Sequence, residues 1–288
     1  MKTIKIIKIK KQLQKLINSA SFILPPDILK AISDAYSVEK NETARKILNL
    51  IIKNAETAAV QKIPLCQDCG TAYVEISVGR NTCIENLNGI ENEINSAVAE
   101  TYLKSYLRKS IVTDPLFDRK NTLTNTPVIL SIEEAEFEGA EIKVSLKGGG
   151  SDNCSYLFML NPSTTPEEIT VLVRDLVIKN ASKSCPPLII GIGIGSSASK
   201  VTELARKAAF RNLNIKNPDK RYGNLEKDIL KEVNLTGIGP AGLGGSTTAL
   251  AVNIEYMPCH MATLPLAVFF LCHSARRASA KISFPSRS

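Results

Sequence analysis

The sequence predicts a mixed α/β protein, with a mainly helical region over about residues 1–63 and an α/β region over about 64–280. Two observations predict this class. Apolar residues recur at helical spacing over 27–62, and β-rich runs alternate with amphipathic stretches from residue 72 onward. The chain contains no internal repeat and no long linker, so a single domain is expected over 1–288.

The expected elements follow one another with recognisable boundaries. The helical pattern of 27–62 stops before Pro64, because proline cannot continue a helix. Thr165-Pro166-Glu167-Glu168 is a capping box with proline at the first helical position. Strands are expected over 72–78, 127–133, 140–147 and 188–194, and helices over 91–112, 165–180, 199–211 and 225–233.

Composition is that of an ordinary globular protein, and the basic N-terminus is expected to be a solvated segment, although a positive balance also suits a small anionic substrate. Six lysines in the first 15 residues contribute to the net charge of +8, and no nucleic-acid-binding motif accompanies them. No signal peptide is visible, and the longest apolar run, Met261 to Cys272, covers about half a membrane span. We therefore expect a cytoplasmic protein without a nucleic-acid or membrane partner.

The cysteines are the most informative residues. There are 7 cysteines and 2 histidines, and an odd number of cysteines without a secretion signal argues against a disulfide framework. His260 and His273 both stand beside cysteines. A chain rich in thiols and poor in imidazole favours soft metal chemistry.

Cys66-Gln67-Asp68-Cys69 has three possible interpretations. A zinc site would need a second ligand pair at regular spacing, which the sequence lacks. A thioredoxin-like pair would follow a strand and open a helix, whereas this one follows a helix and precedes a strand. The third interpretation is one corner of a larger site.

Three glycine-rich stretches and one apolar segment complete the candidates. GIGIGS at 191–196 misses the dinucleotide fingerprint because its third glycine comes one residue early, so a bound carboxylate or cluster is favoured over a nicotinamide cofactor. KGGGSDN at 147–153 and TGIGPAGLGGST at 236–247 also allow close backbone approach. Residues 259–277 carry Cys-His at both ends of an apolar middle, which could also be a core helix with incidental thiols.

Six stretches together resemble the α subunit of class I fumarate hydratases and L-tartrate dehydratases, the oxygen-labile iron–sulfur hydro-lyases. They run in the family's order between about residues 20 and 280. The stretches are PLCQDCG, LRKSIVTDP, KGGGSDN, CPPLIIGIGIG, LTGIGPAGLGGSTTA and CHMATLPLAVFFLCHSARR.

The resemblance implies a 4Fe–4S cluster held by three cysteines, with one iron that has no protein ligand. The matching positions are Cys66, Cys185 and Cys272, separated by 119 and 87 residues, so no local ferredoxin-type spacing reveals them. Cys69 stands where relatives usually have threonine and is the alternative to Cys66. No role is assigned to Cys83, Cys154 and Cys259.

The resemblance also implies the groups that handle substrate. Asp68 and His260 match acid–base or substrate-orienting residues, with a turn carboxylate and a core imidazole as the alternatives. Gln67, Arg108 and the Gly149 backbone match groups that contact substrate carboxylates, although Arg108 could be an ordinary surface residue. The open iron would act as a Lewis acid without redox change.

A partner and a reaction follow as expectations. Fused family members carry a second domain over the cluster, and its absence before Ser288 implies a separate fumarate hydratase β subunit. The expected reaction is reversible hydration of fumarate to malate, and the alternative is L-tartrate dehydration. A non-catalytic zinc or iron–sulfur binding module is the alternative from another class.

Overall fold

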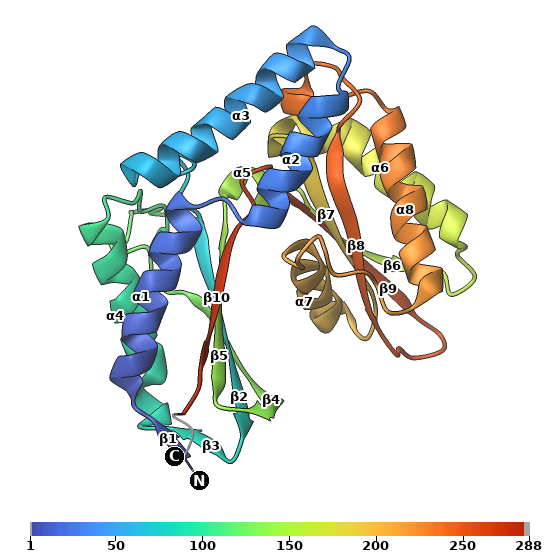
Figure 1. The fold of residues 1–288 in the computed structure, drawn as a ribbon. Coiled ribbons are helices and arrows are strands. Elements are labelled where there is room, and N and C mark those ends of the chain that lie inside the picture. The colour runs from blue at the N-terminus through green and yellow to red at the C-terminus, as the bar shows by residue number, and fades with distance from the viewer. Residues whose placement is uncertain (1, 285–288) are drawn as a thin grey trace. The chain divides into compact units, whose positions relative to one another are not determined.

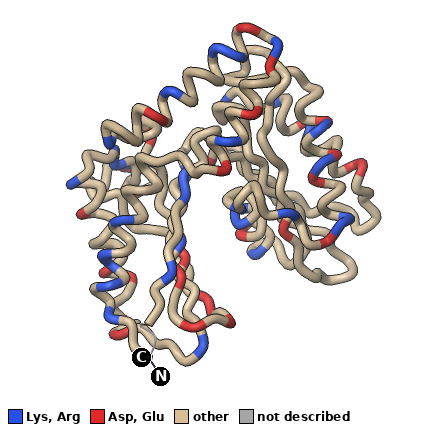
Figure 2. The backbone as a smooth tube through the Cα atoms, viewed as in Figure 1, with Lys and Arg blue, Asp and Glu red and all other residues tan. Residues whose placement is uncertain are grey.

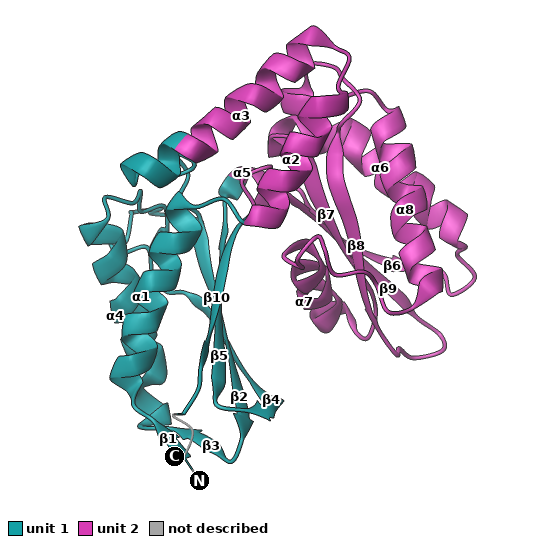
Figure 3. Ribbon diagram, viewed as in Figure 1, with its two compact units in different colours: residues 1–25, 57–149, 276–288 teal, residues 26–56, 150–275 magenta. Residues whose placement is uncertain are grey.

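The computed structural model describes residues 2–284, which form two compact units (Figure 3). Unit 1 consists of residues 1–25, 57–149 and 276–288, and unit 2 of residues 26–56 and 150–275. Each unit has its own sheet and hydrophobic core. The mixed α/β class is confirmed, while the single domain over 1–288 stays a prediction.

Unit 1 is a four-stranded sheet with two helices packed on it (Figure 1). The strand order is β10-β5-β2-β4, and β2 pairs in parallel with β4 and antiparallel with β5. The strands are β2 (Thr71–Arg80), β4 (Ile129–Glu138), β5 (Ala140–Lys147) and β10 (Arg276–Ile282). The helices are α1 (Ile6–Phe22) and α4 (Ile90–Lys104), and a small parallel pair joins β1 (Lys2–Ile4) to β3 (Thr82–Ile84).

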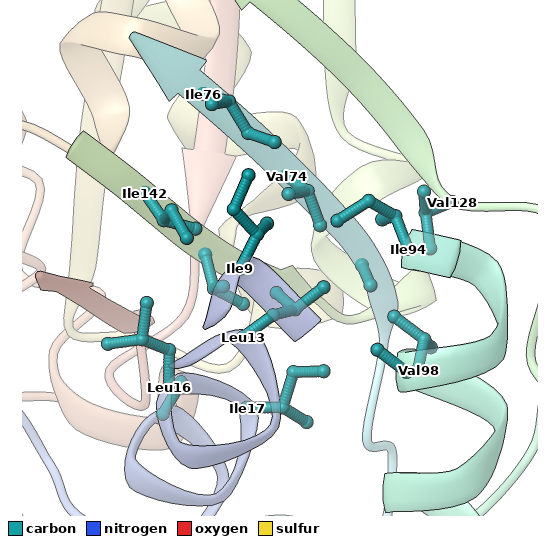
Figure 4. Close-up of a cluster of buried hydrophobic side chains, with 14 of the residues drawn as sticks. Ile9, Leu13, Leu16, Ile17, Val74, Ile76, Ile94, Val98, Val128 and Ile142 are labelled. Carbon is teal, nitrogen blue, oxygen red and sulfur yellow. The ribbon is translucent and has the colours of Figure 1, made fainter. Parts of the chain in front are cut away.

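The core of unit 1 forms where the two helices meet the sheet (Figure 4). Val74 and Ile76 on β2 are buried two residues apart, as expected for one face of a strand. Ile9 and Leu13 on α1 are buried four residues apart, so they lie on one face of the helix. These two periodicities meet in one apolar layer, which fixes β2 and therefore the loop that precedes it.

Unit 2 is a second four-stranded sheet, in the order β6-β9-β7-β8. Strand β7 pairs in parallel with β8 and antiparallel with β9. The strands are β6 (Ser155–Leu160), β7 (Leu188–Gly195), β8 (Ala249–Met257) and β9 (Leu264–Leu271). The helices are α2 (Pro26–Val38), α6 (Pro166–Asn180), α7 (Ala198–Ala209) and α8 (Lys220–Leu235). Helix α3 (Glu42–Gln61) runs through the boundary at residue 57, and the short α5 (Gly149–Asp152) runs through the boundary at residue 150.

The GIGIG stretch lets α7 pack directly on β7. A Cβ atom on Gly191 would lie 2.2 Å from the carbonyl oxygen of Ala205, and one on Gly193 would lie 2.2 Å from that of Val201. Real Cβ atoms do not approach a backbone oxygen so closely, so both positions require glycine. These two glycines therefore have a packing role.

Several predicted elements differ from the structure. The helical run of 27–62 is two helices, because Glu39 turns the chain by accepting the Asn41 N–H. The helix predicted over 91–112 ends at Lys104. The interpretation of 259–277 as a core helix is wrong, because this segment contains β9 and the start of β10. Strand β9 is buried between β6 and β7, so its sequence shows no alternation that would indicate a strand.

Four of the six N-terminal lysines lie on α1 (Figure 2). Lys8, Lys11 and Lys15 are exposed, and Lys10 forms ion pairs with Glu93 and Glu100 of α4. Within residues 2–284, none of the helices combines the length and the apolar character that a membrane crossing requires.

Candidate active site

The predicted site residues fall into two groups. Cys66, Gln67, Asp68, Arg108 and Gly149 belong to unit 1. The remaining three, which belong to unit 2, are Cys185, His260 and Cys272. Each group is described within its own unit.

In unit 1 the CQDC loop connects the end of α3 to the start of β2. Buried Leu65 anchors it, because its N–H donates to the Ser21 carbonyl at 2.9 Å. Gly70 closes the loop with φ of +80°, and a Cβ there would lie 2.7 Å from the Lys147 carbonyl oxygen. Between these anchors Cys66 is partly exposed and Gln67 is exposed.

The Asp68 carboxylate is held by main-chain donors from both sides. Oδ1 accepts the Gly70 N–H at 3.0 Å, and Oδ2 accepts the Gly149 N–H at 2.7 Å. The first contact is a local turn, but the second joins residues 81 apart in sequence. The structure therefore brings Asp68 and Gly149 together, and Asp68 is more than a turn carboxylate.

Cys69 is a poorer ligand candidate than Cys66. Its thiol is 2% exposed and accepts the Arg108 N–H at 3.1 Å. Burial raises the pKa of Cys69 and so disfavours the thiolate, which is the metal-binding form. The Arg108 side chain is exposed, so the structure ties only its main chain to this loop.

Two buried side chains that the sequence did not single out hold the loop's carbonyls. The Tyr102 hydroxyl lies 3.1 Å from the Cys69 carbonyl oxygen and 3.0 Å from that of Gly70. The Asn125 amide donates to the Gly70 carbonyl at 3.1 Å, while its own oxygen accepts the Ser110 N–H. Burial raises the pKa of Tyr102 above its usual range, so its hydroxyl remains a donor.

In unit 2, Cys185 and Cys272 lie at the same end of the sheet. Ile189 near the start of β7 is opposite Leu271 at the end of β9. Two residues after Leu271, His273 donates its main-chain N–H to the Cys185 carbonyl oxygen at 3.4 Å. The His273 Nδ1 lies 3.0 Å from the same oxygen. A carbonyl oxygen only accepts, so Nδ1 carries the proton.

The surroundings of these two thiols are unusual. Cys185 is exposed and has left-handed backbone angles, φ of 53° and ψ of 70°, and non-glycine residues in this region are concentrated at functional sites. The Cys272 Sγ lies 3.1 Å from the Ser274 Oγ. Next to Cys185, the Ser184 Oγ is buried and has no hydrogen-bond partner within residues 2–284.

His260 lies at the other end of the same sheet. It occupies the loop between β8 and β9, and eight residues of β9 separate that loop from Cys272. At about 3.3 Å per residue this separation is roughly 25 Å. His260 is exposed and its Nδ1 accepts the Ala262 N–H at 3.1 Å. The structure therefore does not bring His260 to the two cysteines, and His273 is the imidazole beside them.

The donor chemistry fits an iron–sulfur cluster. All seven cysteines lie in the described part of the chain and form no disulfide, and Cys66, Cys185 and Cys272 are at least partly exposed. Soft thiolates of this kind hold iron–sulfur clusters. Within residues 2–284, no three His, Cys, Asp or Glu side chains are grouped as a metal site.

Comparison with known proteins establishes the family. The fumarate hydratase (fumerase) family matches residues 10–281. The chain belongs to this family. A Methanocaldococcus jannaschii protein, to which the name L(+)-tartrate dehydratase subunit alpha has been assigned, is 36% identical over 286 residues, covering 98% of this chain and all of that protein. The L(+)-tartrate dehydratase subunit alpha of Escherichia coli is 28% identical over 260 residues, covering 89% of this chain and 84% of its own length.

The family resemblance seen in the sequence is thereby confirmed. Fumarate hydratases and tartrate dehydratases both add or remove water at a carbon–carbon double bond, so the chain is a hydro-lyase of the fumarate hydratase family. The family description names fumarate, whereas these relatives are named for L(+)-tartrate, which leaves the substrate to be argued.

Proposed function

We propose that this chain is the α subunit of an iron–sulfur hydro-lyase that hydrates fumarate reversibly to malate together with a separate fumarate hydratase β subunit. The family match over residues 10–281 carries this proposal. The names of the relatives, each a subunit alpha, support a heteromeric enzyme. They also favour a second candidate reaction, dehydration of L-tartrate. Seven cysteines without a disulfide are consistent with a cytoplasmic location.

Cys66, Cys185 and Cys272 would hold a 4Fe–4S cluster. When bound, such a cluster with one open iron supplies Lewis-acid polarisation of the substrate C–O bond. Partial exposure of the three thiols supports this set, and burial of Cys69 speaks against the alternative ligand.

Asp68 is the best supported acid–base candidate. Two main-chain N–H groups orient its carboxylate, so a proton could be held or accepted at a fixed position beside the Gly149 backbone. Gln67 and Arg108 have exposed side chains, as residues that meet a substrate carboxylate require. His260 stays a prediction that the geometry of unit 2 does not support.

The test is anaerobic reconstitution of the chain with iron and sulfide. We expect about four irons and four sulfides per chain in the wild type, and loss of both in Cys66→Ser, Cys185→Ser and Cys272→Ser. Cys259→Ser is the matched control, because Cys259 is an exposed thiol of unit 2 outside the proposed set. Zinc in place of iron, or a cluster indifferent to these three changes, would make the binding-module interpretation the better one.

The substrate is tested in the complex. The chain and a β subunit are purified together and assayed with malate, fumarate and L-tartrate, with Asp68→Asn as the inactive variant. Turnover of fumarate and malate by the complex, with little by the chain alone, is the expected result. Preference for L-tartrate would select the second reaction, and substantial activity of the chain alone would contradict the need for a partner.

A further inference from the structure

Arg276, the first residue of β10, is a buried guanidinium in an unusual setting. It is 2% exposed, and burying a cation is costly unless a partner compensates it. Its Nη1 donates to the main-chain carbonyl of Asp68 at 2.5 Å. Its Nε is buried without a hydrogen-bond partner in the described part of the chain. A cation kept here under these conditions requires an explanation beyond packing.

The guanidinium and the Asp68 carboxylate both lie beside Gly148. A Cβ on Gly148 would lie 3.0 Å from Asp68 Oδ2 and 3.6 Å from Arg276 Nη2. Oδ2 also accepts the Gly149 N–H, so Asp68 is held from two directions. The strand β10 holds the carbonyl of Asp68, and the segment after β5 holds its carboxylate.

We propose that Arg276 is a positioning residue for the CQDC loop, residues 66–69. Its bond to the Asp68 carbonyl fixes the main chain between Cys66 and Cys69, and therefore the directions of the Cys66 thiol and the Asp68 carboxylate. The planar, rigid guanidinium suits this task better than a flexible ammonium.

This role deepens the proposed function, because the catalytic use of the loop rests on it. The positioning itself can be measured without any activity. Cys69 lies at the end of the loop and is 2% exposed, so its alkylation reports loosening of the loop. Cys154, 1% exposed in unit 2, is the internal reference for general unfolding.

The experiment alkylates the full chain with iodoacetamide, without cluster and under anaerobic conditions, and measures each thiol by mass spectrometry. In Arg276→Gln we expect Cys69 to react at least about tenfold faster, with Cys154 within about twofold of the wild type. Arg276→Lys should give an intermediate rate, because it restores a donor with poorer geometry. In the complex with a β subunit, Arg276→Lys should lower kcat more than it raises KM.

The matched control is Arg211→Gln. Arg211 is a partly buried arginine whose buried Nε also has no partner among residues 2–284, but it belongs to unit 2 and forms an ion pair with Glu226. Equal acceleration of Cys69 and Cys154 in Arg276→Gln, or the same Cys69 rate in both variants, would overturn the proposal. If Arg276→Gln does not fold, the ratio of Cys69 to Cys154 rates in Arg276→Lys decides. An enzyme without hydro-lyase activity would leave this result standing and refute only the proposed function.

Discussion

Tyr102 shows how much one hydroxyl contributes to the CQDC loop. Its hydroxyl contacts the Cys69 and Gly70 carbonyls, and the Gly70 carbonyl also accepts from the Asn125 amide. Tyr102→Phe should lower the free energy of unfolding by about 1–3 kcal/mol, because a buried carbonyl loses its donor. Urea denaturation measures this change. Tyr106→Phe removes the same atom from a side chain that is 91% exposed, and it should change stability by less than about 0.5 kcal/mol.

Gly148 is predicted to matter for activity more than for stability. In Gly148→Ala the new methyl would lie 3.0 Å from Asp68 Oδ2, and the carboxylate must shift by a few tenths of an ångström. We expect kcat/KM of the α/β complex to fall by about tenfold, because the reacting groups lose alignment. Gly223→Ala is the control, since its nearest neighbour would lie at 3.7 Å. Wild-type activity of Gly148→Ala would show that the carboxylate position is not critical.

Site residues that belong to a motif could be predicted from the sequence. The residues that support them could not. Asp68 and Gly149 were predicted together, and the structure joins them across 81 residues. Tyr102, His273 and Arg276 act through contacts that span 33, 88 and 208 residues. No local pattern encodes such contacts. His273 had one signal, its place in CHSARR beside Cys272, whereas Tyr102 resembled any core tyrosine.

At the scale of elements, the start of α6 is set by local chemistry. The Thr165 hydroxyl accepts the Glu168 N–H, and the Glu168 carboxylate accepts the Thr165 N–H at 2.7 Å. Thr165→Ala should lower the free energy of unfolding by about 1 kcal/mol, as measured by urea denaturation. Thr164→Ala, one residue outside the cap, is the control. Equal effects of the two changes would contradict the capping role.

The pairing of α1 with α4 should depend on pH. Lys10 and hydrogen bonds from Ser96 and Gln14 lower the pKa of Glu100 to about 2. A lowered carboxyl pKa stabilises the fold above the unfolded value of 4.5, and this stabilisation is lost as pH falls from there toward 2. Glu100→Gln should therefore be less stable than the wild type at pH 7 and equally stable near pH 2. Urea unfolding at both pH values measures the difference, and a constant difference would contradict this assignment.

The elements that the sequence predicted are those with their own signals. The capping box located α6, and alternation located β2. Strand β6 pairs antiparallel with β9, and the burial of β9 removes the alternation that would indicate a strand there. The glycines of β7 resembled a ligand loop because close helix packing and close ligand approach both require a missing Cβ.

At the scale of the whole molecule, the path of the chain couples the two units. The chain passes between them four times, so an unfolded unit 2 would leave unit 1 joined by loops of residues 26–56 and 150–275. Closing such loops costs entropy that grows with their length. We therefore expect one cooperative unfolding transition. Ile76→Ala in unit 1 and Ile192→Ala in unit 2 should each lower the free energy of unfolding by about 2–5 kcal/mol. Both variants should shift the same calorimetric peak to lower temperature. Two peaks, each moved by one variant alone, would contradict the coupling.

Strand β10 also determines when the sheet of unit 1 can be completed during synthesis. The ribosome delivers all of unit 2 before residue 276, whereas β5 must wait for β10 to cover its edge. Until then β5 offers unpaired main-chain groups to any other strand nearby, and the Asp68 carbonyl lacks its arginine. Slow or interrupted translation of the codons for β10 would prolong this vulnerable interval, in which chaperone capture competes with aggregation.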